Sequence, residues 1–308
     1  MENIIFILAT LMLVQVNTIQ GFSCKMMTMH DDNCVFPFKY KNTLYSSCTN
    51  VDHNRQWCAT KYNFDKDKKW GNCRTTVDST SCDEVLSRSN SSKMINGAYF
   101  IKTGDQDTKV YCQMEPLPGC SGNGWTLVMK IDGKKSTFDY SSPYWSNKVS
   151  YSINNGETGF DNKETKLPTY SSASFSKLCL GMKVKNDLRF IELDYRAKSL
   201  YDVIAYNKYR SFTASRSTWE SLVAHPSLQL NCNKGGFNVE GEKDLARVRI
   251  GIIANQENYC DTADSFIGFG SSYTRKKDEL NSCGNMAYFN PKNGARDTKA
   301  MGYIFVRN

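Results

Sequence analysis

Aromatic and sulfur-bearing side chains gather in one short stretch, residues 34–40, with the sequence CVFPFKY. The flanking segments, MTMHDDN before it and KNTLYSS after it, are mostly polar. Little apolar sequence is therefore available nearby to bury these rings. Exposed aromatic patches on small domains typically mark binding surfaces. We expect some of the rings to form a core and others to bind a ligand by stacking on flat apolar groups or facing a cation.

Four cysteines, Cys34, Cys48, Cys58 and Cys73, enclose this aromatic segment. A segment of about 40 residues rarely builds a sufficient core, so covalent crosslinks must substitute for one. The chain has 12 cysteines and no C-x-x-C pair that would suggest zinc, which favours disulfides formed in an oxidising compartment. Two disulfides would each stabilise the module by roughly 2–4 kcal/mol. The spacing alone leaves three pairings open.

The sequence contains none of the common catalytic motifs. The three histidines, His30, His53 and His225, fall in unrelated contexts, and no H-E-x-x-H, G-x-S-x-G or Walker loop is present. Nucleic-acid binding has no support beyond a mild formal net charge of +8. We therefore expect a protein that is not an enzyme and does not bind nucleic acid.

An apolar run, IIFILATLMLVQV, occupies residues 4–16. It is too short to span a bilayer and has the length of a signal-peptide core. Residues 1–20 are therefore predicted to be a signal peptide, followed by an N-terminal segment at 21–33. No other window is apolar enough for a transmembrane anchor. We expect a secreted, extracellular protein.

Strand patterns dominate the sequence after a polar linker at residues 74–81. The segment ARVRIGI predicts a half-buried strand with Arg247 and Arg249 on the outer face. The nearly apolar AMGYIFVR at the C-terminal end should lie centrally in a sheet. Further strands are predicted at IELDY and GWTLVMKIDG.

Two capping-box patterns predict short helices within the same region. They are Ser81 with Glu84 and Ser217 with Glu220. The mixture of these helices with the strand patterns predicts an α+β, mostly antiparallel domain over residues 82–308.

The aromatic segment, residues 34–73, resembles the fibronectin type II module. CVFPFKYKNTLYSSCT, WCATKYNFD and KWGNC match its order of cysteines and rings. The resemblance implies a small disulfide-rich, kringle-like β fold with Cys34–Cys58 and Cys48–Cys73 pairs, and Phe36 and Phe38 are expected in its core. It also implies a shallow pocket for apolar side chains of collagen-like chains or for choline headgroups. Carried over by position, the wall of this pocket consists of Tyr40, Trp57, Phe64 and Trp70, with Tyr62 nearby.

The larger region resembles the opening of fibrinogen-like and intelectin-like C-terminal domains. The matching phrases are SCDEVL, GAYFIKTG, VYCQMEP and GNGWTLVMKIDG. Looser matches further along, such as SCGNMAYF and MGYIFVR, look most like secreted cnidarian matrix proteins of the coral skeletal-organic-matrix type. The resemblance implies a Cys82–Cys112 disulfide that ties the first helix to a hairpin.

Fibrinogen-like lectins hold calcium in an acidic loop close to a disulfide. In this sequence Asp261 and Asp264 follow Cys260, whereas calcium requires six to eight oxygen ligands and commonly several carboxylates. Two acids supply too few of them, so we expect no metal or other cofactor, and calcium binding is the alternative.

The remaining cysteines predict further disulfides, and one sequon predicts glycosylation. The resemblance favours a Cys260–Cys283 pair, which leaves Cys179–Cys232 within the large domain and Cys24–Cys120 between the two parts. The sequon that begins at Asn90 predicts N-glycosylation.

Together these features predict a secreted adhesion or extracellular-matrix protein. Its expected partners are matrix proteins or glycans, bound by the aromatic pocket and by the fibrinogen-like domain. Three alternatives stay open: a soluble fibrinogen-related lectin of innate defence, a structural component of an organic or mineralised skeletal matrix, and a secreted effector such as a venom component.

Overall fold

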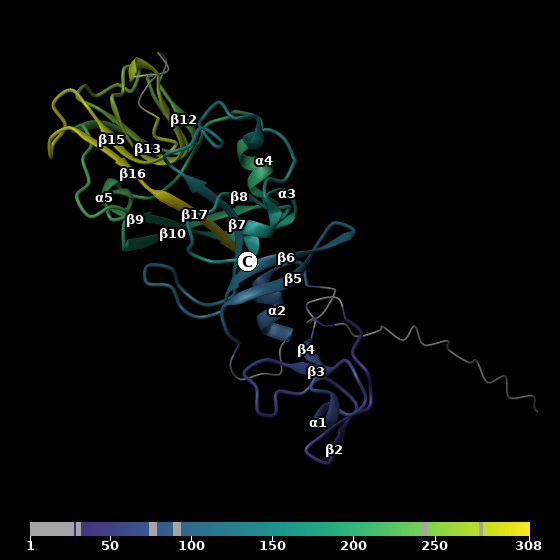
Figure 1. Ribbon diagram of the computed structural model, residues 1–308. Helices are drawn as coiled ribbons and strands as arrows, with labels where there is room; N and C mark the ends of the chain where they lie inside the picture. The colour runs from purple at the N-terminus through teal and green to yellow at the C-terminus, as the bar shows by residue number, and fades with distance from the viewer. Residues whose placement is uncertain (1–27, 29–31, 74–78, 89–93, 242–244, 277–279) are drawn as a thin grey trace, which may run out of the picture.

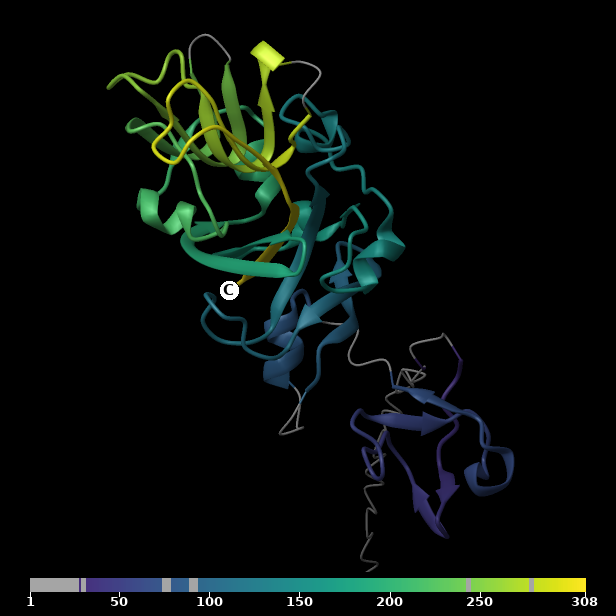
Figure 2. The ribbon, with the colours of Figure 1, turned by 60° about the vertical axis from the view of Figure 1, so that its left-hand side comes forward.

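The computed structural model describes residues 28, 32–73, 79–88, 94–241, 245–276 and 280–308. The predicted signal peptide, Cys24 and Asn90 lie outside these residues. Across the described part of the chain, no helix is long and apolar enough to cross a membrane. The chain forms a small module of short strands and a larger body built on two sheets (Figures 1 and 2).

The small module consists of two antiparallel strand pairs and one short helix. Strand β1 (Phe38–Tyr40) pairs with β2 (Thr43–Tyr45), β3 (Trp57–Ala59) pairs with β4 (Trp70–Asn72), and α1 spans Phe64–Asp67. Both predicted disulfides of the module, Cys34–Cys58 and Cys48–Cys73, are present. The buried apolar core is small, as its length requires. Its members are Cys34, Phe38, Trp57, Cys58, Ala59 and Cys73.

The first sheet of the larger body has seven antiparallel strands in the order β10-β9-β17-β7-β6-β5, with β8 paired to β7. Its strands are β5 (Gly97–Thr103), β6 (Gln106–Gln113), β7 (Trp125–Asp132), β8 (Thr165–Lys166), β9 (Phe175–Val184), β10 (Asp187–Ala197) and β17 (Met301–Arg307). The predicted apolar C-terminal strand is β17, and it lies between β9 and β7 as expected. The predicted strands IELDY and GWTLVMKIDG belong to β10 and β7.

The second sheet has six antiparallel strands in the order β11-β12-β13-β14-β15-β16. They are β11 (Arg210–Ser211), β12 (Asn231–Glu240), β13 (Ala246–Asn255), β14 (Ser265–Tyr273), β15 (Cys283–Ala287) and β16 (Arg296–Lys299). The main core forms where the two sheets meet, because Leu180 and Ile304 of the first share one apolar cluster with Ile250 and Ile267 of the second.

Helices are short throughout the larger body. They are α2 (Cys82–Arg88), α3 (Thr169–Ser172), α4 (Leu200–Ile204), α5 (Arg216–Glu220) and the 3-10 turns η1 (Pro143–Trp145), η2 (Ile153–Glu157) and η3 (Thr274–Lys276). The region is therefore mostly β, and the α+β prediction gave too much weight to two capping patterns.

The two capping predictions had different outcomes. At α2 the Ser81 hydroxyl accepts a hydrogen bond from the Glu84 backbone N–H at 3.4 Å, as predicted. Helix α5 instead begins two residues earlier than expected, because Ser215 caps it by accepting from the Thr218 N–H at 3.2 Å. The predicted capping residue Ser217 lies inside the helix.

Strand β13 is buried on both faces, which corrects the half-buried prediction. Arg249 is only 6% exposed. Its side chain is accommodated because its guanidinium donates to the Tyr140 carbonyl at 2.8 Å and to the Asn238 side-chain oxygen at 2.8 Å. Alternation of charged and apolar residues indicated a face exposed to water. Arg249 is instead buried, and protein groups take the place of water as its hydrogen-bond acceptors.

The predicted linker ends earlier than residue 81. Ser79 and Ser81 are buried, and the Ser79 carbonyl accepts a hydrogen bond from the Lys102 backbone N–H at 2.8 Å. The last residues assigned to the linker therefore pack on the larger body beside β5.

The disulfides of the larger body confirm one prediction and correct three. Cys82–Cys112 is present, but the other two bridges are Cys120–Cys179 and Cys232–Cys260. The predicted Cys24–Cys120, Cys179–Cys232 and Cys260–Cys283 pairs are therefore wrong.

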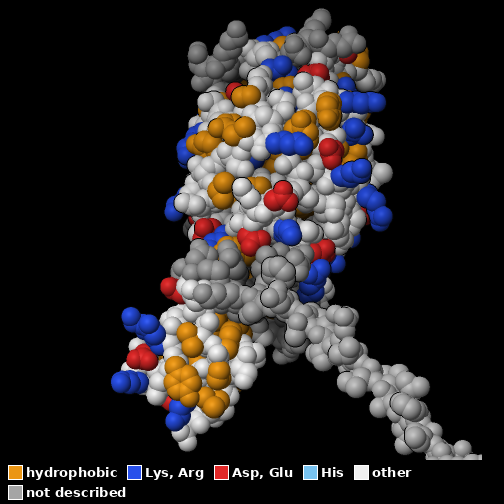
Figure 3. Space-filling view, turned by 90° about the vertical axis from the view of Figure 1, so that its right-hand side faces the viewer, with side chains coloured by type: hydrophobic (Ala, Val, Ile, Leu, Met, Phe, Trp, Pro, Cys, Tyr) orange, Lys and Arg blue, Asp and Glu red, His pale blue; other side chains and the backbone are white. Residues whose placement is uncertain are grey.

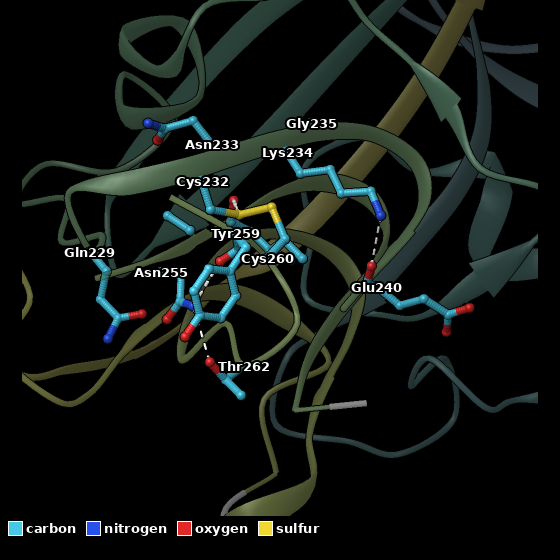
Figure 4. Close-up of a disulfide and its surroundings, with 12 residues drawn as sticks. Gln229, Cys232, Asn233, Lys234, Gly235, Glu240, Asn255, Tyr259, Cys260 and Thr262 are labelled. Atoms are coloured by element: carbon cyan, nitrogen blue, oxygen red, sulfur yellow. Dashed lines mark hydrogen bonds between the residues drawn. A yellow bond between two sulfur atoms is a disulfide. The ribbon is translucent and has the colours of Figure 1, made fainter. Parts of the chain in front are cut away.

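The corrections follow from the sheet topology. Cys179 lies on β9 of the first sheet and Cys232 on β12 of the second, so a bridge between them would have to join two different sheets. Cys283 is free and fully buried on β15, where burial raises the pKa of its thiol. Figure 4 shows the Cys232–Cys260 bridge, which links β12 to the loop that carries Tyr259.

Candidate ligand-binding pocket

A shallow cavity of about 140 Å³ opens on the small module. Its lining combines four large rings with three residues of one loop. The lining residues are Tyr40, Val51, Asp52, His53, Trp57, Phe64 and Trp70. Apolar side chains gather on one face of this module (Figure 3). The short strands and α1 position the rings, and the loop between β2 and β3 supplies the remainder.

Trp57 on β3 is the central ring of the pocket. It is 4% exposed, and its ring centroid lies 5.2 Å from that of Tyr40, 4.9 Å from Phe64 and 5.9 Å from Trp70. Its indole N–H donates to the Val51 carbonyl at 3.0 Å. This bond ties the loop to the pocket floor, so Trp57 serves the core and the pocket together.

Trp70 forms the accessible wall. It is 43% exposed, and its ring meets those of Trp57 and His53 edge to face, with centroids 5.9 and 4.9 Å away. A hydrogen bond of 2.8 Å between the His53 Nε2 and the Asn72 side-chain oxygen fixes the histidine. Trp70 can therefore present apolar surface to a ligand without reorganising the module.

Asp52 forms the polar end of the pocket. Its carboxylate accepts hydrogen bonds from the Tyr40 hydroxyl at 3.0 Å and from the Lys41 ammonium at 2.8 Å. The bonds from Lys41 and Tyr40 lower the pKa of the Asp52 carboxyl, and the bond to Asp52 raises the pKa of Lys41. Both groups are thus charged at neutral pH and neutralise each other.

The structure brings together four of the five ring residues expected from the sequence. Tyr40, Trp57, Phe64 and Trp70 line one cavity, whereas Tyr62 is 56% exposed and does not line it. Phe38 is fully buried and Phe36 packs against the same core, as predicted.

Sequence reasoning missed the loop residues Val51, Asp52 and His53. Their types carry no periodic signal, and the one available hint was their position between the second cysteine and the Trp57-Cys58 pair.

Four cysteine sulfur atoms cluster in this module in a way that could suggest a metal site. The four sulfur atoms of Cys34, Cys48, Cys58 and Cys73 lie within 4.8 Å of one another. They are joined pairwise as disulfides, so they are not thiolates that could hold an ion.

The acids considered for calcium lie far along the chain, in the loop between β13 and β14 of the second sheet. Asp264 is buried, and its carboxylate accepts from the Tyr273 hydroxyl at 2.7 Å and faces the Arg275 guanidinium at 3.6 Å. This oxygen therefore already has two protein partners. Asp261 is partly buried in the preceding turn.

Known proteins resemble the small module. Residues 34–73 match the sequence profile of the Fibronectin type II domain, a collagen- or glycan-binding module of extracellular proteins. The five disulfides among the described residues also fit an oxidising, extracellular environment.

Two longer proteins are similar to this chain over part of their length. The chain is 33% identical over 81 residues to "Hepatocyte growth factor activator serine proteases" of Canis lupus familiaris, covering 26% of the chain and 12% of the relative. It is 32% identical over 82 residues to the Mus musculus protein of that description, covering 26% and 13%. The chain thus spans about an eighth of the length of these relatives. The match covers the type II region alone and says nothing about enzymatic activity here.

Proposed function

We propose that this chain is a secreted, non-enzymatic adhesion or extracellular-matrix protein whose type II module binds apolar side chains of collagen-like chains. The observation that carries the proposal is the convergence of Tyr40, Trp57, Phe64 and Trp70 on one open cavity. Flat rings at right angles form a slot that fits a proline ring or a similar apolar group. The signal peptide predicted at residues 1–20 would direct the chain to the extracellular space.

We further propose that the larger body supplies a second recognition surface of the fibrinogen-like kind, for matrix protein or glycan. Support comes from its opening, where the Cys82–Cys112 disulfide ties α2 to the hairpin of β5 and β6. This arrangement agrees with the sequence resemblance. Two weak sites on one chain would give avidity if both can engage one matrix surface.

Affinity chromatography of the full chain on immobilised gelatin tests the first proposal. We expect the chain to be retained at physiological salt and to pass through a matched albumin column. Retention should be lost after reduction and alkylation, because the module depends on Cys34–Cys58 and Cys48–Cys73. Passage of the native chain through gelatin without delay would refute collagen-like binding.

A glycan array with and without EDTA tests the second proposal. Binding to one class of glycan supports a recognition role for the larger body, and EDTA sensitivity would identify a metal-dependent lectin. An array without signal would contradict the glycan part of the proposal.

A further inference from the structure

Two of the four pocket rings already carry a cation from the module itself. The Lys41 ammonium lies 5.5 Å from the centroid of the Tyr40 ring, and the Lys68 ammonium lies 5.3 Å from that of Phe64. An ammonium over a ring face satisfies the electrostatic attraction that would otherwise draw a cationic ligand there. A second cation at these rings would have to displace a lysine or sit beside it.

Backbone contacts hold both lysines beside two rings that line the pocket, although neither lysine belongs to the lining itself. Lys41 occupies the turn between β1 and β2 with a positive φ of 46°, and its N–H donates to the Asp65 carboxylate at 3.1 Å. Lys68 ends α1 in the left-handed conformation, and its N–H donates to the Phe64 carbonyl at 2.9 Å. Lysine side chains are flexible, but these hydrogen bonds fix the backbone of Lys41 and Lys68.

The carboxylate of the pocket is also already paired with a lysine. Asp52 is the acidic residue among the lining residues, and it already accepts from Lys41 and Tyr40. A quaternary ammonium has no N–H with which to replace these hydrogen bonds.

The surrounding charge is positive. Residues 34–73 contain seven Lys and Arg, three Asp and no Glu, which gives a formal charge of 7 − 3 = +4. This excess repels cationic ligands and attracts acidic chains, most strongly at low ionic strength.

We propose that Lys41 and Lys68 are specificity-determining residues that exclude quaternary ammonium groups from the pocket and select uncharged, proline-type rings carried on acidic peptide segments. The inference rests on the proposed function, because it names the ligand class of that same pocket. Specificity arises from a repulsive element as well as from ring contacts.

The test compares three forms of the full chain by NMR titration at low salt: wild type, Lys41→Gln/Lys68→Gln, and the control Lys61→Gln/Lys66→Gln. The control removes the same number of charges from the same module. Lys61 and Lys66 are exposed and belong neither to the pocket lining nor to its ring–cation pairs. The probes are choline chloride and two proline-rich peptides that differ only in flanking Glu or Lys residues.

Wild type should bind the Glu-flanked peptide more tightly than the Lys-flanked peptide. The Lys41→Gln/Lys68→Gln variant should gain choline affinity by about ten-fold, as expected when one or two ring faces and a carboxylate become available. The control should bind choline as wild type does.

Equal choline affinity in wild type and Lys41→Gln/Lys68→Gln would overturn the inference, and so would an equal gain in the control. Equal binding of the two peptides by wild type would overturn the selection for acidic segments. Failure of wild type to bind either peptide would refute the proposed function instead. The choline comparison would still decide whether the lysines exclude cations.

Discussion

Replacing Trp70 by alanine should separate ligand binding from folding in the small module. Trp70 is 43% exposed and contributes a wall of the pocket, whereas the central ring Trp57 is nearly buried. The substitution therefore removes contact surface for a ligand while it leaves the core ring and both disulfides of the module in place.

The magnitude follows from its contacts. Trp70 makes two edge-to-face ring contacts, with Trp57 and His53. Such pairs are worth roughly 0.5–1.5 kcal/mol each beyond the area they bury, so with the loss of partly buried surface the free energy of unfolding should fall by roughly 1–3 kcal/mol. Truncating an aromatic hot-spot residue costs about 2 kcal/mol of binding free energy or more. This loss corresponds to a roughly 30-fold larger dissociation constant.

The matched control is Tyr62→Ala. Tyr62 is 56% exposed in the same module but does not line the pocket. Gelatin affinity and thermal unfolding of both variants should show a large binding loss for Trp70→Ala and none for Tyr62→Ala, with both variants still folded. Wild-type affinity in Trp70→Ala, or an equal loss in Tyr62→Ala, would refute the assignment of the pocket.

Three further predictions concern stability and the arrangement of the two parts. Converting Cys232 and Cys260 to serine should lower the free energy of unfolding by roughly 3–4 kcal/mol in a chemical denaturation experiment, because their bridge closes a loop with a sequence separation of 28. Burial lowers the pKa of Lys166 to about 8, so between about pH 8 and 10.5 the unfolded chain binds a proton that the folded chain has lost. The stability of wild type relative to Lys166→Met should therefore rise with pH across that window, by roughly 3 kcal/mol at most. Arg55 donates to the Asn96 carbonyl of the larger body at 3.1 Å, so Arg55→Ala should loosen the docking of the module and increase the radius of gyration measured by small-angle scattering.

Each of these predictions has a result that contradicts it. Unchanged denaturation of the serine variant would mean that the bridge does not restrict the unfolded chain. Parallel pH profiles of wild type and Lys166→Met would show that the lysine titrates normally. An unaltered scattering curve for Arg55→Ala would show that other contacts orient the module.

The sequence predicted the small module well because its fold is set by short covalent loops. Once the order of cysteines and rings is recognised, little freedom is left for Tyr40, Trp57, Phe64 and Trp70, and all four line the cavity. The polar wall could not be predicted in this way. Asp52 and His53 reach the pocket through tertiary hydrogen bonds to Tyr40 and Asn72, for which residue type and spacing give no signal.

The larger body was harder because its contacts join distant segments. Strand patterns located β13 and β17, but not the division into two sheets that separates Cys179 from Cys232. Arg249 shows the same limit, since its burial depends on Tyr140, more than a hundred residues away. Periodicity identifies strands, whereas cysteine partners and buried charges depend on topology.

The most direct measurement follows the five tryptophan indole signals by NMR while an acidic, proline-rich peptide is added to the full chain. Trp57 and Trp70 line the pocket, whereas Trp125, Trp145 and Trp219 are buried in the larger body. We predict that the Trp57 and Trp70 signals shift together and saturate while the other three remain in place. Binding of the peptide without any shift at Trp70 would contradict the central claim.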